Sequence, residues 1–305
     1  MTAIAPARSA ATGVLAINKP AGATSFDVIR QVRRIVSERR IGHAGTLDPA
    51  ATGLLPLCVG RTTRLVDYFH AQSKTYHCRV RFGVTSPTLD LESATSFRAD
   101  ASALTAAEVE AALINFQGEI EQVPPMHSAV HHEGKRLYDL ARAGKTVDRP
   151  PRKATIHKIS LLSFTPGKEA EVELEIVTGK GTYVRVLASD LGELLGYGAV
   201  LSWLERTAYG ALSLSDALTI EELAALPDPR SALLPPETAV LFLPRVDLAP
   251  QLATQLLNGQ QVWLPRGLLA GDGPCRIHNY SGTLIALGGA KGGLLRAEKV
   301  LSNEQ

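Results

Sequence analysis

A loop with a single carboxylate lies between Gly42 and Gly60, in the stretch GHAGTLDPAATGLLPLCVG. The carboxylate is Asp48, and the glycine and alanine residues around it leave a large ligand room to approach the backbone. Pro49 lacks an N–H group and disfavours helical backbone at the residue before it, so Asp48 cannot lie inside a helix. A lone Asp before Pro is also a common turn or N-cap residue. The loop alone leaves two interpretations open, a catalytic carboxylate and a turn residue.

The segment after Asp48 indicates how the loop is held. Residues 54–60, LLPLCVG, carry no charge, which is typical of a buried strand. A polar group attached to a buried strand keeps a fixed position, as catalysis requires.

The composition indicates a globular protein with one large and one small domain, or two domains of medium size. The chain has 305 residues, of which 45% are hydrophobic and 20% charged, so a disordered chain is excluded. Cys58, Cys78 and Cys275 form no Cys-x-x-Cys pair, which suits a reducing compartment and argues against a zinc site. Residues 1–12 lack the apolar core of a signal peptide, and no apolar run approaches the ~18 residues of a membrane span. We expect a cytoplasmic protein with a disordered segment at residues 1–12.

Positive charge is concentrated in two segments, although the net charge is only +2. Residues 26–40 contain five arginines against two acidic residues, and residues 124–153 contain seven Lys or Arg against three. Prolines bracket the second segment, and its length and charge predict a mobile arm that becomes ordered on RNA. Such clusters are typical of phosphate-backbone binding, but two solvated faces would have the same composition. The pair His131-His132 could suggest a metal, but in a basic arm we favour phosphate contact.

Hydrophobic periodicity predicts strands and helices in no repeating βαβ order, which favours an α+β fold around a mostly antiparallel sheet. Two helices are predicted to begin at capping boxes, Thr24 with Asp27 and Thr105 with Glu108. Residues 85–103 are polar and are expected to form a loop, in which Asp90 is unimportant for activity. Further strands are expected at 14–17, 76–82, 172–176 and 183–187, with a helix at 188–195.

The C-terminal part of the chain has the pattern of a small β module. Residues 227–244 are rich in proline, which is the composition of a linker. A helix is predicted at 250–257, and short strands with Gly-rich turns follow at 262–264, 276–280, 283–287 and 294–300.

Residues 42–65 resemble the motif of the TruB-type tRNA pseudouridine synthases, Gly-His-x-Gly-x-Leu-Asp-Pro-x-Ala-x-Gly. The resemblance covers most of the chain and includes NKPAGATSFDVIR (18–30), KTYHCRVRFG (74–83), VPPMHSAVHHEGKRLYDLARAG (123–144) and GTYVRVLASDLG (181–192). Departures are small: Ala44 and Ala50 stand where Thr and Leu are common, and His127 stands where Tyr is expected.

The resemblance implies a pseudouridine synthase domain at 13–245, with a basic RNA-binding arm at about 124–153, and a PUA-like β-barrel at 246–305. It implies isomerisation of uridine 55 to pseudouridine in the T loop of tRNA, with Asp48 as nucleophile or base on a flipped-out uridine. This reaction has no redox step, so we expect no cofactor and no metal. The expected partner is the T-arm stem-loop of tRNA, and we expect no membrane association, no obligate protein partner and a monomer. The alternative is a non-catalytic protein that binds and remodels tRNA.

The resemblance also assigns residues around the catalytic aspartate. Arg185 matches the arginine that pairs with it, and strand alternation is expected to place Arg185 on one face with Tyr183. Tyr76 matches the pocket tyrosine and His43 the histidine that contacts flipped-out RNA, while Leu201 and Tyr183 are expected to wall the pocket. The arm residues expected to bind RNA are Lys135, Arg136, Arg142 and Arg152.

Overall fold

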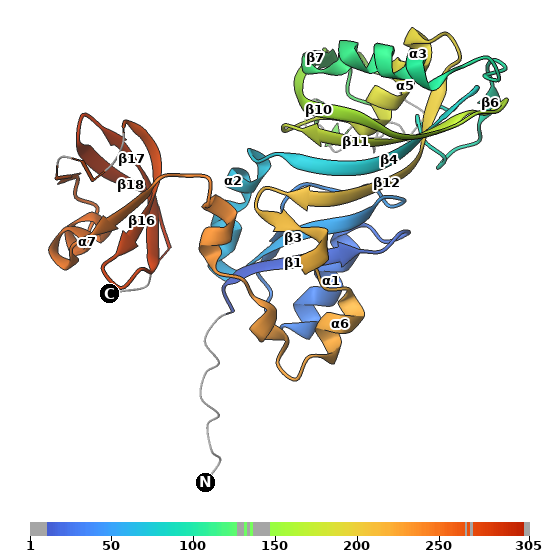
Figure 1. Ribbon diagram of the computed structural model, residues 1–305. Coiled ribbons are helices and arrows are strands. Elements are labelled where there is room, and N and C mark those ends of the chain that lie inside the picture. Colours follow the sequence, from blue (N-terminus) through green and yellow to red (C-terminus); the bar gives the residue numbers. More distant parts are fainter. Residues whose placement is uncertain are drawn as a thin grey trace.

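The computed structural model describes residues 11–126, 147–265, 267–268 and 271–301, and the backbone alone at 131–132 and 135–136. Within these residues the chain forms one nine-stranded sheet flanked by helices and, apart from it, a five-stranded sheet near the C-terminus (Figure 1). The predicted α+β class is confirmed.

The large sheet has the strand order β1-β3-β12-β4-β11-β10-β7, with β2 beside β3 and β13 beside β12. In the described part of the chain its pairs are antiparallel except β12 with β3, so the mostly antiparallel prediction is confirmed. Its strands are β1 (Gly13–Lys19), β2 (Ile41–His43), β3 (Thr52–Val59), β4 (Lys74–Phe82), β7 (Gly118–Gln122), β10 (Arg152–Thr165), β11 (Glu171–Thr178), β12 (Ala199–Tyr209) and β13 (Leu212–Ser213).

Helices cover the large sheet at both ends (Figure 1). Those near β1 pack on each other and on that strand, and those at the opposite end pack on β10 and β12. They are α1 (Ser25–Ile35), α2 (Val66–His70), α3 (Ala106–Leu113), α5 (Val184–Leu194) and α6 (Ile220–Ala225), with 3-10 turns η1 (Gly60–Leu65), η2 (Ile114–Phe116) and η3 (Leu214–Asp216).

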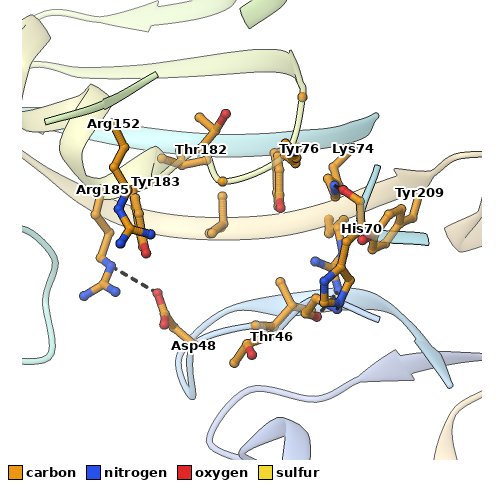
Figure 2. Close-up of a pocket in the computed structure, with 18 of the residues that line it drawn as sticks. Thr46, Asp48, His70, Lys74, Tyr76, Arg152, Thr182, Tyr183, Arg185 and Tyr209 are labelled. Carbon is orange, nitrogen blue, oxygen red and sulfur yellow. Dashed lines mark hydrogen bonds and ion pairs between the residues drawn. The ribbon is translucent and has the colours of Figure 1, made fainter. Parts of the chain in front are cut away.

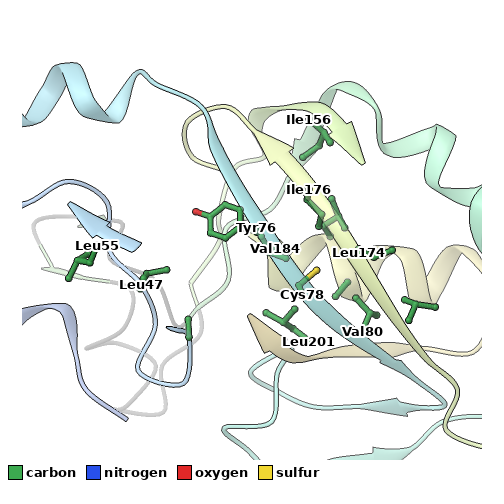
Figure 3. Packing of buried hydrophobic residues seen from close by; sticks show 14 of the residues in the cluster. Leu47, Leu55, Tyr76, Cys78, Val80, Ile156, Leu174, Ile176, Val184 and Leu201 are labelled. Atoms are coloured by element: carbon green, nitrogen blue, oxygen red, sulfur yellow. The ribbon is translucent and has the colours of Figure 1, made fainter. Parts of the chain in front are cut away.

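Capping and alternation explain the predicted elements that the structure confirms. Thr24 caps α1 in a reciprocal capping box with Asp27, and Thr105 caps α3 in the same way with Glu108. The alternate residues of β4 that include Tyr76, Cys78 and Val80 face the buried core (Figure 3), and the intervening residues pair with glutamates of β11 on the open face. This sheet therefore has one dry face, which the helices cover.

The segment 183–187 is not a strand, so that prediction is wrong. Tyr183 is the N-cap residue of α5, and Arg185 lies in the first turn of the helix. Val184, Leu187 and Leu191 are buried at helical spacing. The five residues 183–187 are too few for their apolar positions to distinguish the helical period from the strand period.

The segment 85–103 is more ordered than a simple polar loop. It contains β5 (Val84–Thr85) paired with β6 (Ser96–Phe97), and Asp90 forms an isolated bridge with Leu201 of β12. Asp90 is 7% exposed, so the expectation that it lies in a simple polar loop is wrong. Its expected unimportance for activity stays a prediction.

In the basic arm, β8 (His131–His132) and β9 (Lys135–Arg136) form a short antiparallel pair. The helical character expected around 136–143, the mobility of the arm and the position of His127 lie outside the described residues.

The C-terminal sheet has the order β14-β16-β17-β18-β15 and encloses its own core, as expected of a PUA-like domain. The predicted helix is confirmed as α7. The elements are β14 (Arg245–Leu248), α7 (Pro250–Leu257), β15 (Val262–Trp263), β16 (Gly273–Asn279), β17 (Leu284–Lys291) and β18 (Leu294–Val300).

The proline-rich segment 227–244 is not a free linker. Two of its prolines begin the 3-10 turns η4 (Pro229–Ala232) and η5 (Pro236–Val240), where the missing N–H costs nothing. Leu234 exchanges backbone hydrogen bonds with Val14, and Val240 is buried.

None of the helices that the structure describes has both the length and the apolar composition of a membrane span.

The two sheets share one apolar cluster, in which Leu287 of β17 packs with Val240 and Leu243. Next to it, Arg64 donates to the carbonyl oxygen of Val300 at 2.6 Å and Lys299 donates to that of Arg64 at 3.0 Å. The C-terminal sheet is therefore docked on the segment around η1 and η5.

Leu287→Ala should lower the free energy of unfolding by roughly 2–5 kcal/mol, because a buried side chain is removed from a cluster that both sheets build. Urea unfolding of both proteins measures the change. Leu162→Ala, at a position that is 49% exposed, serves as the control and should change stability by at most about 0.5 kcal/mol. Equal costs for the two variants would contradict the docked arrangement.

Candidate active site

A cavity of about 590 Å³ opens beside the middle of the large sheet, where the Asp48 loop faces the first turn of α5 (Figure 2). This volume lies in the range of small-molecule and cofactor sites. The loop after β2, the end of α2, the starts of β4 and β10, the turn after β11 and the strand β12 contribute to its walls. The lining residues are Gly45, Thr46, Leu47, Asp48, His70, Lys74, Tyr76, Arg152, Lys153, Gly179, Lys180, Gly181, Thr182, Tyr183, Val184, Arg185, Leu204, Arg206 and Tyr209.

A three-membered charge network lies at the Asp48 end of the cavity. Arg185 Nε lies 3.0 Å from Asp48 Oδ2, and Arg185 Nη1 lies 3.4 Å from Asp90 Oδ2. Arg185 also donates to the carbonyl oxygen of Thr88 at 3.4 Å. The guanidinium is 6% exposed, so the two carboxylates and the carbonyl replace its water. Arg185 is thereby fixed in one position against Asp48.

Burial and the neighbouring charges act on Asp48 in opposite directions. Burial raises the pKa of Asp48 above its ordinary value, Arg185 lowers it, Asp90 raises it, and Lys19 lowers it. The side chain is 39% exposed, but that surface faces the cavity, which explains how the carboxylate is both reachable and poorly solvated. A carboxylate in this position is reactive because bulk water does not fully solvate its charge.

Lys19 holds the Asp48 loop from inside the protein. The side chain is fully buried, and Nζ donates to the carbonyl oxygens of Pro20 (2.9 Å), Ala23 (2.7 Å) and Pro49 (3.1 Å). Burial lowers the pKa of Lys19 to about 8, although Asp48 opposes this shift. The three hydrogens of the ammonium group thus tie the Asp48 loop, at Pro49, to the turn between β1 and α1.

Other backbone contacts complete the support of the loop. Ser25 Oγ accepts from the Leu47 N–H at 3.0 Å, and the Gly45 N–H donates to His70 Nε2 at 3.3 Å. Arg206 donates from Nε to the carbonyl oxygen of Leu54 (2.7 Å) and from Nη2 to that of Gly45 (3.2 Å). The residues before and after Asp48 are therefore both tied to the sheet.

Two tyrosines form flat surfaces near the carboxylate. Tyr76 lies on β4 and is 9% exposed. It lines the middle of the cavity, between the charged groups at the two ends of the cavity (Figure 2). The backbone of Tyr183 is fixed by Gln122, whose side chain accepts from its N–H at 2.9 Å and donates to its carbonyl oxygen at 3.2 Å. The sequence predicted both tyrosines, but Gln122, which is 2% exposed, gave no signal.

The structure brings some predicted site residues together and separates others. Asp48, Tyr76, Tyr183 and Arg185 line one cavity, as does Arg152, which begins β10 at the base of the arm. Lys135 and Arg136 belong to β9, of which only the backbone is described, and Arg142 lies outside the described residues.

His43 and Leu201 are not among the lining residues. His43 lies on β2. Burial lowers the pKa of His43, and the nearby Arg206 and His70 lower it further. Its Nδ1 has no hydrogen-bond partner among the described residues. Leu201 is 5% exposed in the main core and bridges to Asp90, so it supports the charge network from behind.

The sequence did not indicate five further residues at the site, which are Asp90, Lys19, Lys74, Arg206 and Tyr209. Lys19 and Lys74 each lie in a stretch that carries the family resemblance, which was the available signal. Asp90 and Arg206 reach the site through pairing of distant strands, which periodicity does not show.

The arrangement supports general base or nucleophilic chemistry by one carboxylate on a flat, polar molecule. Within the described part of the chain no group of three or more His, Cys, Asp or Glu side chains could hold a metal ion.

Comparison with known proteins identifies the family of this chain. The chain matches the family described as "TruB family pseudouridylate synthase (N terminal domain)" over residues 33–184. The protein named "tRNA pseudouridine synthase B" of Dehalococcoides mccartyi is 48% identical over 257 residues, 83% of this chain and 85% of the relative. The protein of the same name from Ralstonia nicotianae is 42% identical over 296 residues, 95% of this chain and 94% of the relative.

The fold has a similar solved structure. A chain from the crystal structure of a Cbf5-Nop10-Gar1 complex superimposes with a TM-score of 0.74 at 25% identity, covering 96% of this chain and 85% of that chain. Fold and site together define a pseudouridine synthase. This chain belongs to the TruB family of pseudouridylate synthases.

Arg185→Gln should raise the pKa of Asp48 by about 1–3 units, because an adjacent arginine lowers the pKa of an aspartate by that amount. The charged carboxylate exists above its pKa, so in the variant it would be lost at a higher pH as the solution is acidified. A carbon-13 NMR titration of the Asp48 carboxyl group measures the midpoint. Arg81→Gln, which removes an ion pair with Glu171 on the open face of the sheet, is the control and should leave the midpoint unchanged. Equal midpoints for all three proteins would contradict the role of Arg185.

Proposed function

We propose that this protein converts uridine 55 in the T loop of tRNA into pseudouridine, with Asp48 acting on a uridine flipped into the cavity. The observation that carries the proposal is the Asp48–Arg185 pair at one end of a cavity walled by Tyr76 and Tyr183. The relatives named tRNA pseudouridine synthase B supply the substrate class. The protein would act in the cytoplasm as a monomer, without a cofactor.

The reaction is an isomerisation that one carboxylate can serve. The N1–C1′ bond of uridine breaks, the base turns, and a C5–C1′ bond forms, while the C5 proton is lost and N1 gains a proton. Atoms and electrons balance within the nucleoside, so no external oxidant or reductant is required. Asp48 can add to C6 of the base, trap C1′, or remove the C2′ proton, and each route requires the ionised form.

The surrounding residues take distinct parts in this proposal. Arg185 favours the charged form of Asp48 and fixes its direction. Tyr76 offers a flat surface for uracil and a hydroxyl group for the C5 proton, and Tyr183 walls the pocket. His43 contacts the displaced RNA, and Leu201 supports the wall from the core. A base leaves its stack at a cost of a few kcal/mol, which stacking in the cavity offsets.

RNA binding is assigned to three parts of the chain. Residues 13–245 would form the catalytic domain and residues 246–305 the PUA-like RNA-binding domain. The arm at about 124–153, with Lys135, Arg136, Arg142 and Arg152, would grip the T-arm stem-loop through its phosphates.

Asp48→Asn should abolish pseudouridine formation, with a loss of at least about a thousandfold, and leave tRNA binding within a few-fold of the original protein. The amide is nearly isosteric but has no charge and is a poor nucleophile and base. Tritium release from tRNA labelled at C5 of uridine measures the rate, and filter binding measures the affinity.

Asp100→Asn is the matched control, because exposed Asp100 accepts a backbone hydrogen bond from Ser102 that an asparagine also accepts. It should keep near-normal activity. Turnover by Asp48→Asn, after deamidation back to Asp has been excluded, would remove Asp48 from the catalytic role and favour a tRNA-binding protein without this activity.

A further inference from the structure

Three cations gather at the end of the cavity that lies away from Asp48. They are Lys74, Lys180 and Arg206, and all three line the cavity. In Figure 2, Lys74, His70 and Tyr209 lie on one side of the view and Asp48 and Arg185 on the other. Across the described residues, no carboxylate forms an ion pair with any of the three cations. We name Lys74, Lys180 and Arg206 the cationic end.

The sheet register brings the three cations together from neighbouring strands. Lys74 is the first residue of β4 and pairs with Tyr209 of β12 on one side and with Thr178 of β11 on the other. Arg206 lies on β12, three residues before Tyr209, and pairs with Tyr76. Lys180 lies in the turn directly after Thr178. The sheet register thus fixes the positions of Lys74 and Arg206, and the exposed turn after β11 adds Lys180.

Neighbouring groups hold the two buried cations in place. Lys74 Nζ donates to the carbonyl oxygens of His70 (2.9 Å) and Gln72 (2.7 Å), which leaves one N–H. Its Nζ lies 4.7 Å from the ring centre of Tyr209, and the Arg206 guanidinium carbon lies 5.0 Å from the same centre. Arg206 uses Nε and one N–H of Nη2 on carbonyl oxygens, so further N–H groups are left.

Several donors at the cationic end lack an acceptor. The hydroxyl of Tyr209, which is fully buried beside Gly45, has no hydrogen-bond partner among the described residues. Lys180 is exposed, and within the described part of the chain its ammonium forms no hydrogen bond or ion pair. His70 Nε2 and the carbonyl oxygens of His70, Gln72 and Gly45 each already accept a hydrogen bond. Among the described residues, the cationic end therefore has donors to spare and no negative charge to pair with them.

Burying cations without a counter-ion has an electrostatic cost. Lys74 is 7% exposed and Arg206 is 1% exposed, although charged side chains are almost never buried this deeply without an acidic partner. Burial lowers the pKa of Lys74 to about 8, and Arg206 and Lys180 lower it further in the same direction. The lysine is still mainly protonated at neutral pH, and an anion beside it would relieve this cost.

We propose that the cationic end binds a phosphodiester group of the RNA strand next to the flipped-out uridine. The inference rests on the proposed function, because it assumes that RNA enters this cavity with a base at Asp48. A phosphate diester supplies what is missing, one negative charge and oxygens that accept hydrogen bonds from several directions. The bound phosphate would fix the sugar of the target nucleotide, so that C1′ is held still while the base turns above Tyr76.

A thermodynamic cycle between protein and RNA tests this contact. The RNA is a T-arm hairpin in which single phosphates near the target uridine are replaced, one at a time, by uncharged methylphosphonates. The proteins carry Asp48→Asn, so that no RNA is converted during the measurement, with or without Lys180→Gln or Lys74→Met. Fluorescence anisotropy gives the dissociation constants.

Neutralising one particular phosphate should weaken binding by roughly tenfold with the cationic end intact, and by less than about twofold once Lys180 or Lys74 has been replaced. Lys180→Gln should also reduce the salt dependence of binding by about one phosphate contact. Lys168→Gln, at an exposed position outside the cavity, is the control and should leave the full effect in place. Because Lys180 is exposed, its variant tests the proposal even where Lys74→Met does not fold.

Two results would overturn the subsite. In the first, the loss of affinity from neutralising a phosphate and the loss from replacing Lys180 or Lys74 would add for every phosphate tested. This result would show that the cationic end contacts no single phosphate. Binding that responds to removal of a neighbouring base, and not to loss of phosphate charge, would assign this end of the cavity to a base. Pseudouridine formation by the protein with Asp48 intact is scored separately: its absence would end the proposed function, while its presence beside purely additive binding effects would end the subsite alone.

Discussion

The buried ion pair between Asp48 and Arg185 is the interaction on which the site depends. It joins the loop after β2 to the first turn of α5, two segments that are far apart in the sequence and meet beside the sheet. An aspartate with poor access to water would lose its charge, and an arginine with 6% exposure needs partners. Each residue therefore stabilises the other in its buried position, and removing Arg185 would take the ion-pair partner from both Asp48 and Asp90.

A second pattern supports this pair: buried cations bind main-chain carbonyl oxygens. Lys19, Lys74 and Arg206 each donate to at least two carbonyls, and these carbonyls belong to the Asp48 loop, to the turn between β1 and α1, to β3 or to the end of α2 and the turn after it. Such contacts satisfy backbone groups that no strand or helix pairs, so the loop stays ordered without regular structure. They also place positive charge around the cavity, so loop support and affinity for an anionic substrate arise from the same side chains.

The sequence predicted the fold class, most strands and the central carboxylate because those features are local or repeat with a clear period. The one-sided alternation of β4 and β11 and the capping boxes at Thr24 and Thr105 are examples. The helix predicted at 188–195 is present, but the first turn of α5 was taken for a strand because the five residues 183–187 are too few to separate the two periods, and Gln122 on a distant strand fixes the start of the helix. Asp90 was misjudged because its burial comes from a bridge to Leu201 across the chain, which composition cannot show.

The central claim is that this cavity isomerises one uridine of tRNA. Mass-spectrometric mapping tests it most directly, after the purified protein has been incubated with an unmodified full-length tRNA transcript and no added cofactor. We expect one pseudouridine per molecule, at position 55 in the T loop. A transcript that is bound but stays unmodified, or one that is modified elsewhere and not at position 55, would contradict the proposed function.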